Sequence, residues 1–434
     1  MVRFGMAAAA LALMASPLLA QESTEQLKKE LQELRAEVDA LKAVNTTKEI
    51  PSSGKAAQDA MAADDNPVMT LFKQTKLSGF VDAGYVFSFN QLHSDGAATN
   101  NAGQNPSRLF DNLGNSFYLN AVQLQLERLA SKDMIVGYHI ELAAGHDPLI
   151  YDGAAVTLQE GWAQIMAPVG DGLDIRVGRM AALHGYEVLE SVNDMNYSRS
   201  MLFSVAQAFT HTGVRAAYWF GEQFGATIGF NNGFNTAAGI GNKFADDNHG
   251  KGLEFQFAAK PVKDLYFGVT GMVAHENTLN TGDLVFLMDI VASYTMDKLT
   301  VALNWTHVGI QGVATQAPGS RAEFHGIALY GKYQLTDAFS QALRIEYFSD
   351  VNGFVGGING GTLGPVVAGD SGTGSRIVDL TLTSELKVAQ QLILRFEIRH
   401  DNSNNHNFSR GNDNGAAKAA RGDTTLGFEA IMPF

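Results

Sequence analysis

From Lys76 onward, apolar and polar residues alternate with a period of two, and the pattern returns after every break until the last residue. The stretch 76–90 is the first example, with Val81 and Phe87 on one face and polar residues on the other. A period of two is typical of a β-strand with one apolar and one polar face. The sequence therefore predicts an all-β architecture over 76–434.

The connections between these stretches alternate between two kinds. Short ones such as VGDG, GEQ and MDK are followed by long ones rich in Gly, Asn, Asp and Ser, such as NTAAGIGNKFADDNHG. Short turns at one end and long loops at the other are typical of a bacterial outer-membrane β-barrel. Seven short turns join fourteen strands, and one more strand at each end gives about sixteen antiparallel strands. An even number places both ends of the barrel on the short-turn side, toward the periplasm.

The last ten residues, TLGFEAIMPF, keep the alternation to the final position. The ends of soluble domains are usually poorly ordered, whereas an open strand edge is not tolerated in a membrane. We therefore expect the terminal strand to close the barrel against the first one. Its apolar face carries Phe428, Met432 and Phe434, which are typical of the C-terminal signal read by the outer-membrane insertion machinery.

A soluble β-sandwich is the alternative, because its strands alternate in the same way around a core. Two features favour the membrane. Aromatic residues gather at strand ends, for example Tyr218 and Trp219, as in the interfacial girdles of transmembrane barrels. The alternation also runs to the end of the chain. We expect a barrel in the outer membrane, in contact with its lipid.

Residues 1–20 have the layout of a secretory signal peptide, with Arg3, an apolar run and then Ala20 before the expected cleavage point. Leu18 is atypical, because a small residue is usual at its position. A membrane anchor is the alternative, but the apolar run is short for spanning a bilayer. After Ala20 there is no run of 18 or more apolar residues, so the sequence predicts no membrane-spanning helix in the mature protein.

Residues 21–44 carry a heptad pattern that predicts a short coiled-coil helix in the periplasm. A linker over 45–75 follows it. A single amphipathic helix packed on its own domain is the alternative, and leucine at both seam positions leaves dimer and trimer open. The seam residues, spaced 4, 3, 4 and 3 apart, are Leu27, Leu31, Leu34, Val38 and Leu41.

Charge and composition argue against several functional classes. The formal net charge of −14 argues against nucleic acid as a partner, because binding the phosphate backbone requires a basic face. The chain has no cysteine, no phosphate loop and no dinucleotide fingerprint. The GDSG at 369–372 lies in a Gly-rich loop, and 401–412 lacks two positions of a calcium loop. We expect no enzymatic activity, cofactor or metal site, with His139, His184 and His211 as ordinary hydrogen-bonded histidines.

Residues 162–221 contain four specific sequence words, APVGDGLDIRVGR, GYEVLES, NYSRSMLF and FTHTGVRA. Together with weaker matches near 115, 289, 333 and 394, they make 76–434 similar to the OmpL-like β-barrel porin family. The resemblance implies a porin-like channel. It implies no particular solute, because the family is not tied to one, and the coiled-coil segment lies outside it.

In such a barrel the polar face lines the lumen, because a charge facing lipid costs about 2–4 kcal/mol at the midplane. A slight acidic excess among the inward charges indicates a weak preference for cations. In the stretch LILRFEIRHD the charges alternate in sign along one wall, and they either neutralise one another or take part in transport. The charges that parity turns inward are Arg176, Arg215, Lys332, Arg344, Arg395, Arg399, Asp82, Glu141, Asp174, Glu254, Glu346, Asp379, Glu385, Glu397 and Glu429.

The long stretch 182–213 is apolar enough to fold back into the barrel, where it would form a constriction. The eyelet residues that we expect there are Tyr186, Glu187, Tyr197 and Arg199. A loop that only braces the barrel wall is the alternative. The wall residues expected to line the pore with them are Arg176, Arg215, Arg344, Glu346, Arg395, Glu397 and Arg399.

These patterns predict a porin with a water-filled channel for passive diffusion of ions and small hydrophilic solutes. A homo-oligomer is expected, with a trimer favoured by analogy with porins. A structural tether is the alternative, with a plugged barrel and a coil that contacts peptidoglycan. A barrel lipid hydrolase would need a Ser–His pair on the lipid-facing surface, where the sequence places apolar residues.

Overall fold

The computed structural model describes 74–434, apart from 91–104, 106, 132–133, 235–249, 276–283, 312–320, 353–373, 390 and 412–417. The chain divides into two compact units, Met1–Gln74 and Thr75–Phe434. The expected signal peptide and coiled-coil segment, and nearly all of the linker, lie outside the described residues.

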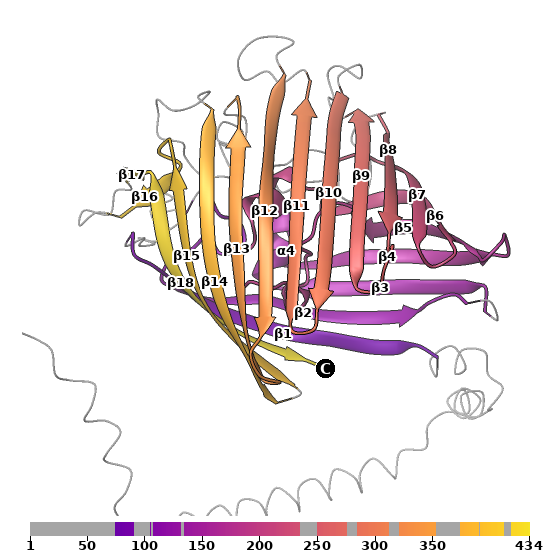
Figure 1. Ribbon diagram of the computed structural model, residues 1–434, viewed down its shortest axis with the longest axis horizontal. Coiled ribbons are helices and arrows are strands. Elements are labelled where there is room, and N and C mark those ends of the chain that lie inside the picture. The colour runs from indigo at the N-terminus through magenta and orange to yellow at the C-terminus, as the bar shows by residue number, and fades with distance from the viewer. Residues whose placement is uncertain are drawn as a thin grey trace, which may run out of the picture. The chain divides into compact units, whose positions relative to one another are not determined.

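Sixteen antiparallel strands form one closed barrel, as the alternation predicted (Figure 1). Two further short strands, β16 (Phe408–Arg410) and β17 (Lys418–Ala420), pair with each other in the connection before the last barrel strand. The barrel strands are β1 (Lys76–Ser88), β2 (Ser116–Arg128), β3 (Val136–Ala144), β4 (Val156–Ala167), β5 (Leu173–Ala181), β6 (Thr210–Phe220), β7 (Phe224–Asn231), β8 (Gly252–Ala259), β9 (Leu265–His275), β10 (Leu284–Met296), β11 (Leu299–Ile310), β12 (Ala322–Gln334), β13 (Phe339–Asp350), β14 (Ser375–Ala389), β15 (Leu392–Ser403) and β18 (Gly422–Pro433).

The closing seam joins β1 to β18. The last residue takes part in it: the Phe434 N–H donates to the Gly79 carbonyl at 2.9 Å, and the Gly79 N–H donates to the Phe434 carbonyl at 3.0 Å. Phe428, Met432 and Phe434 lie on the outer face with 49–57% of their surface exposed. The expected pairing of the terminal strand with the first strand is therefore confirmed.

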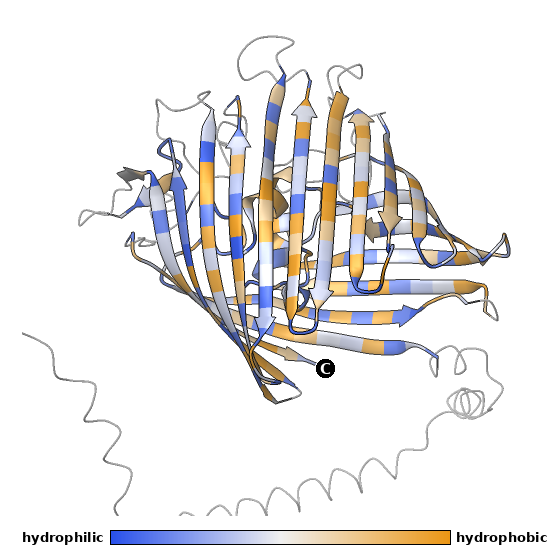
Figure 2. Ribbon diagram, viewed as in Figure 1, coloured by the Kyte–Doolittle hydropathy of each residue, from blue (hydrophilic) through white to orange (hydrophobic). Residues whose placement is uncertain are grey.

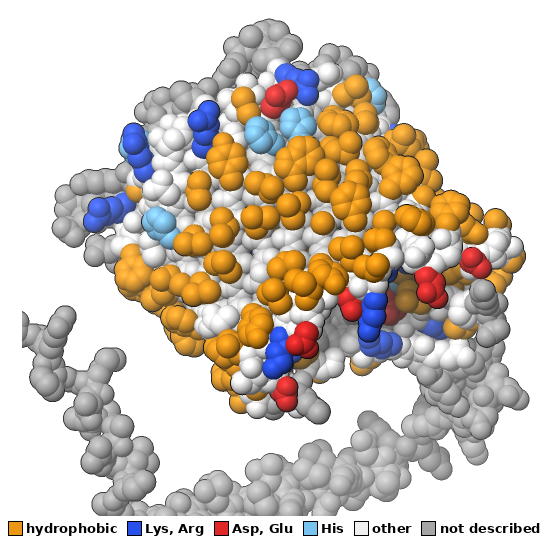
Figure 3. Space-filling view, in the orientation of Figure 1, with side chains coloured by type: hydrophobic (Ala, Val, Ile, Leu, Met, Phe, Trp, Pro, Cys, Tyr) orange, Lys and Arg blue, Asp and Glu red, His pale blue; other side chains and the backbone are white. Residues whose placement is uncertain are grey.

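The outer face of the barrel is apolar. Large hydrophobic side chains there are heavily exposed, for example Phe117 (85%), Phe257 (61%) and Leu380 (50%). Figure 2 shows hydrophobic and hydrophilic residues alternating along the strands, and Figure 3 shows a broad apolar field with charged side chains and histidines at its edges. A continuous apolar band flanked by polar rims is the surface that a bilayer solvates. Within the described residues, no helix has the length and hydropathy needed to cross a membrane.

The interior of the barrel contains three stretches from the long-loop side. They are 105 with 107–113, the helix α4 (His146–Asp152), and 182–209, which connects β5 to β6 and which we call the inner segment. The inner segment includes the short helices η1 (Ser191–Asn193) and η2 (Leu202–Ala206). Its fold into the barrel interior agrees with the expectation for 182–213.

Candidate functional site

The inner segment crosses the lumen and is hydrogen-bonded to strands on opposite sides of the barrel. Near its start, the Gly185 N–H donates to Asp289 of β10 at 3.0 Å. The Ser191 hydroxyl donates to Asp82 of β1, which lies nearly opposite β10 in the ring. The segment therefore spans the width of the barrel instead of lining one wall.

Two wall glutamates bind the backbone of the inner segment. Glu397 of β15 accepts hydrogen bonds from the N–H groups of Tyr197 and Ser198 at 2.8 and 3.1 Å. Glu346 of β13 does the same for Met201 and Leu202, at 2.9 and 2.8 Å. A carboxylate that accepts two backbone N–H bonds makes charge-assisted hydrogen bonds of the stronger class. Each glutamate thus fixes two consecutive residues of the segment.

Three wall arginines bind its carbonyl groups. Arg395 donates to the carbonyls of Ser191 and Asp194 at 2.9 and 2.7 Å. Arg399 donates to the Arg199 carbonyl at 2.7 Å. Arg344 donates to the Ser198 carbonyl at 2.5 Å. The guanidinium groups thus supply donors where the glutamates supply acceptors.

The same arginines are also paired with carboxylates. Arg344 contacts Glu187 of the inner segment at 2.9 Å and Asp379 of β14 at 3.2 Å. Arg399 contacts Asp401 at 2.8 Å. We call Arg344, Glu346, Arg395, Glu397 and Arg399 the charged wall, and each of them is 0–2% exposed. The charges of these residues are therefore neutralised by neighbouring carboxylates, and the same residues attach the inner segment to the barrel wall. The sequence had left both roles open as alternatives to a role in transport.

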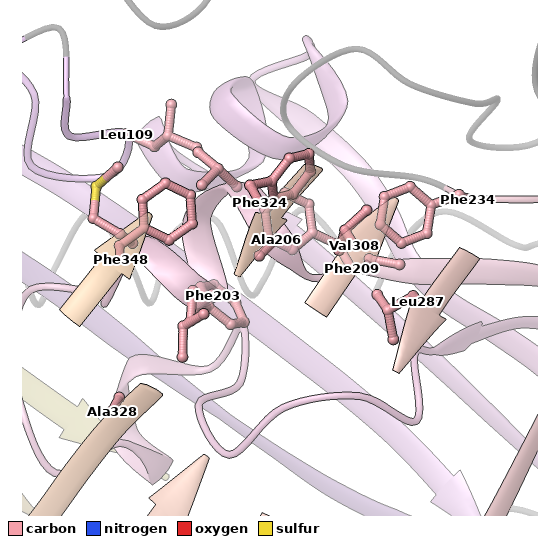
Figure 4. Packing of buried hydrophobic residues seen from close by; sticks show 14 of the residues in the cluster. Leu109, Phe203, Ala206, Phe209, Phe234, Leu287, Val308, Phe324, Ala328 and Phe348 are labelled. Carbon is pink, nitrogen blue, oxygen red and sulfur yellow. The ribbon is translucent and has the colours of Figure 1, made fainter. Parts of the chain in front are cut away.

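Strands β9–β12 present apolar side chains to the inner segment instead of charged ones. We call these four residues the apolar wall, and each is 0–1% exposed: Met272, Leu287, Val308 and Phe324. Figure 4 shows Phe203, Ala206 and Phe209 of the inner segment lying among Leu287, Val308, Phe324 and Phe348 of the strands. Burying apolar surface is worth about 25 cal/mol per Å². This cluster is thus a hydrophobic core inside the barrel, which the strand alternation did not predict because inward positions of a porin wall were expected to be polar.

Two of the expected eyelet residues turn back into the segment or toward the wall. The Arg199 guanidinium lies 3.0 Å from Asp194 and donates to the carbonyls of Leu189 and Tyr197. The ring of Tyr186 packs against Tyr330 of β12 at 4.8 Å. Of the four expected eyelet residues, Glu187, Tyr197 and Arg199 are buried at 4–5% exposure, and Tyr186 is partly exposed.

The remaining expected residues lie on β5 and β6. Arg215 is buried at 8% exposure and contacts Glu254 at 2.9 Å, and Glu254 also contacts His211 at 2.6 Å. Arg176 differs, because its side chain is 34% exposed and pairs with Asp174 at 2.8 Å. The structure thus brings most of the expected residues together around the inner segment, while Arg176 stays apart from it.

His184, in the inner segment outside the spanning strands, is fully enclosed. Its ring packs against His211 with the centroids 5.4 Å apart, and neither of its ring nitrogens has a hydrogen-bond partner in the structure. Burial, reinforced by His211 and Arg215, lowers the pKa of His184 to about 3. The imidazole is therefore neutral at physiological pH.

A second polar site lies at the short-turn end of β1–β4, and sequence reasoning missed it. A cavity of about 330 Å³ there is lined by His139, Glu141, Glu160 and Glu190, among others. Among the described residues, no Lys or Arg forms an ion pair with any of these three glutamates. Parity placed Glu141 inside, but Glu160 was not expected there. A β-bulge between Glu141 and Leu142 of β3 shifts the register with β4. Its signal in the sequence is a slip in the alternation of β4, whose outward apolar positions change from Val156 and Leu158 to Ala163 and Ile165.

Comparison with solved structures shows the porin fold. The trimer form of OmpT from Vibrio cholerae matches with a TM-score of 0.53 and 11% identity, covering 83% of this chain and 99% of that one. An anion-selective porin from Comamonas acidovorans matches with the same score, identity and coverage. The outer-membrane channel DcaP of Acinetobacter baumannii matches with a TM-score of 0.52 and 9% identity, covering 83% and 97%. No curated protein matches the chain by sequence.

The model of one protein family matches the sequence over residues 74–434, which is the whole barrel. That family is described as "Putative beta-barrel porin-2, OmpL-like". The match confirms the resemblance that the words between 162 and 221 indicated. The chain is therefore a porin-like outer-membrane barrel and belongs to the OmpL-like β-barrel porin family.

Proposed function

We propose that this protein is an outer-membrane diffusion channel for ions and small hydrophilic solutes, in which the inner segment narrows the lumen. The observation that carries the proposal is a closed barrel of sixteen strands whose lumen is crossed, at defined positions, by one segment bound to the wall. A sixteen-stranded barrel is wide enough for an aqueous channel. The inner segment then decides how much of that width remains for a solute.

The expected pore residues take two different roles in this proposal. Nine of the eleven are at most 8% exposed, so their role is to hold the inner segment in place. Arg176 and Tyr186 keep exposed surface, and they are the residues of this set that meet a permeating solute. No chemical step is involved.

We propose a preference for cations. The arginines of the charged wall are neutralised by their carboxylate partners, whereas Glu141, Glu160 and Glu190 form no ion pair with a Lys or Arg in the described part of the chain. Uncompensated charge of one sign in a pore sets its ionic preference. The anion selectivity of the porin from Comamonas acidovorans does not carry over, because 11% identity supports a shared fold alone.

Single-channel conductance of the refolded protein in a planar bilayer tests the proposal, with a salt gradient to give the ionic preference from the reversal potential. The informative variant is the double substitution Glu346→Gln and Glu397→Gln, which weakens the attachment of the inner segment. We expect stepwise conductance in the wild type and a larger step in the variant. Glu323→Gln, at a rim position paired with the exposed Arg321, is the matched control and leaves the step unchanged.

A second function, a structural tether with a plugged barrel, is favoured by the burial of the charged wall. A wild-type barrel that is folded but silent, with conductance appearing only in the double variant, would support the tether and contradict the diffusion channel. A reversal potential of the anion-selective sign would overturn the cation preference alone.

We further propose a homotrimer with the coil of residues 21–44 in the periplasm, and Phe428, Met432 and Phe434 as the insertion signal. Deleting residues 22–44 and measuring the mass of the detergent-solubilised oligomer tests the role of the coil, since an unchanged oligomer would remove it. Replacing Phe434 by Ser and measuring the fraction of protein inserted in the outer membrane tests the signal.

A further inference from the structure

The cavity at the short-turn end brings two glutamates face to face. Glu141 of β3 and Glu160 of β4 are directly opposite each other in the strand register, and both side chains line the cavity. Like charges at directly opposite positions of a sheet destabilise it. The third glutamate, Glu190 of the inner segment, lines the same cavity, and Gln159 of β4 donates to its Oε1 atom. Buried charges are normally paired or coordinate a metal ion, and no Lys or Arg pairs with these three carboxylates among the described residues, which leaves His139 beside Glu141 as the basic group of the cavity.

His139 adds a nitrogen ligand to this oxygen-rich cavity. Its Nε2 atom lies 3.3 Å from Glu141 Oε2. One ligand atom each from His139, Glu141 and Glu160 can be chosen so that all three lie within 4.8 Å of one another. One imidazole and two carboxylates are a ligand set that divalent first-row metals accept, Zn²⁺ among them.

Each of the three side chains is held from behind by a second group. The other ring nitrogen of His139, Nδ1, contacts Glu127 at 3.1 Å, which is the carboxylate–histidine pairing found behind metal-bound imidazoles. Gln123 donates to Glu141 Oε1 at 2.8 Å, which leaves Oε2 toward His139. Outer-sphere partners of this kind orient the ligands before an ion binds.

Glu160 is held in the same way. The indole N–H of Trp162 and the backbone N–H of Ala181 both donate to its Oε2 atom, at 3.0 and 2.9 Å. The Trp162 ring stacks on His139 with the centroids 4.9 Å apart and the planes within 4° of parallel. The orientation of each of the three ligands is therefore supported independently of an ion.

We propose that His139, Glu141 and Glu160 form a binding site for a divalent transition-metal ion of the Zn²⁺ class, with Glu190 as a fourth ligand. With a neutral imidazole, one such ion balances the opposed pair of glutamates. Because Glu190 belongs to the inner segment, the ion also ties that segment to β3 and β4. The site does not depend on conduction, but a bound ion neutralises two of the glutamates on which the proposed cation preference rests. The reversal potential is therefore measured on metal-free protein, which keeps the two tests separate.

Equilibrium binding of Zn²⁺ alone to the full-length refolded protein, with metal counted per chain after dialysis, is the first experiment. We expect one ion per chain. Glu141→Gln and Glu160→Gln each weaken binding at least about tenfold, and the outer-sphere variant Glu127→Gln weakens it about 10–100-fold. The control is the double variant His307→Gln and His325→Gln, which removes two histidines on β11 and β12 with ring centroids 6.1 Å apart and leaves the affinity unchanged. Heat modifiability on gels verifies that every variant is a folded barrel.

Visible absorption of Co²⁺ bound in place of Zn²⁺ tests the site in the wild-type protein, so the result does not depend on whether a variant folds. The spectrum should show a low-coordinate site with nitrogen and oxygen ligands, and one equivalent of Zn²⁺ should abolish the bands. Absence of Zn²⁺ binding at millimolar concentration would overturn the proposal. So would binding that survives in the Glu141→Gln, Glu160→Gln double variant, or that is lost in the His307, His325 control.

Discussion

The inner segment is attached to the barrel in two different ways. The charged wall of β13–β15 binds its backbone through directional hydrogen bonds and ion pairs, such as Glu397 with two successive N–H groups. The apolar wall of β9–β12 buries apolar side chains of residues 201–209. The hydrogen bonds on that side come from one side chain of this stretch, Gln207, which donates to Asn304 and Thr306 of β11. The two walls therefore contribute differently. The hydrogen bonds of the charged wall determine which residue of the inner segment lies at each position, because they are directional. Burial of apolar side chains against the apolar wall stabilises the segment without requiring one exact position.

The largest effect is expected at the centre of the charged wall. Arg344→Met removes the ion-pair partner of Glu187, one of the two arginine partners of Asp379, and the donor to the Ser198 carbonyl. Leaving buried charges without a partner costs about 3–5 kcal/mol. Urea unfolding of the barrel in phospholipid vesicles, followed by tryptophan fluorescence, should show this loss in the free energy of unfolding.

Arg176→Met is the matched control, because this arginine is one-third exposed and its only ion pair among the described residues is with Asp174. Its guanidinium also lies over the Trp162 ring, 4.4 Å from the centroid. Its loss should stay below about 1 kcal/mol, as for exposed pairs. Equal losses in the two variants would contradict the distinction between a charged wall that holds the inner segment and an arginine that does not.

The apolar wall is broken by Leu202→Ala. Leu202 is 0% exposed and packs against Gly326 of β12, where an added Cβ would lie 2.8 Å from its side chain. Truncating a buried leucine costs about 2–5 kcal/mol, and we expect about 3 kcal/mol from the same unfolding measurement. Gly326→Ala overfills the same site and should cost about 1–3 kcal/mol. A neutral result for both variants would mean that this wall does not hold the segment.

The sequence predicted the barrel far better than the site. Strand number and closure follow from a period that repeats over the whole barrel, so a local error does little harm. The inner segment could be predicted to enter the lumen because Met201, Leu202 and Phe203 need burial. The sequence did not specify that Glu346 and Glu397 bind backbone N–H groups, because those partners come from about 150–200 residues away in the chain. The bulge beside Glu160 shows in the sequence only as a slip in the alternation between Leu158 and Ala163, which does not say which way the Glu160 side chain turns.

Glu397→Gln sharpens the comparison, because it keeps the size of the side chain and removes its charge. Net contributions of hydrogen bonds to charged groups are about 1.5–3 kcal/mol, so we expect a loss of about 2 kcal/mol. Added salt should change this difference little, since Glu397 is 2% exposed and buried interactions are screened weakly. Glu323→Gln, at the exposed rim, should stay within about 0.5 kcal/mol.

At neutral pH the smallest effect is expected where the inner segment leaves β5, because the His184 imidazole is uncharged there and neither of its ring nitrogens has a hydrogen-bond partner in the structure. The enclosed His184 faces His211, Glu254 and Arg215, and its pKa is lowered from 6.5 to about 3. Between these two values the unfolded chain binds a proton that the folded one does not. The free energy of unfolding therefore rises with pH in this window, by at most about 1.4 kcal/mol per unit, and the contribution is lost as the pH falls from 6.5 toward 3.

His184→Gln removes this dependence, so on acidification through that window the unfolding free energy of the wild type should fall steadily relative to that of the variant. The exposed His400, which contacts Thr424 at 2.8 Å, supplies the control: His400→Gln should keep the wild-type slope. A pH-independent difference for His184→Gln would mean that the imidazole stays protonated inside the barrel. Its packing would then depend on Glu254, and this end of the inner segment would resemble the charged wall.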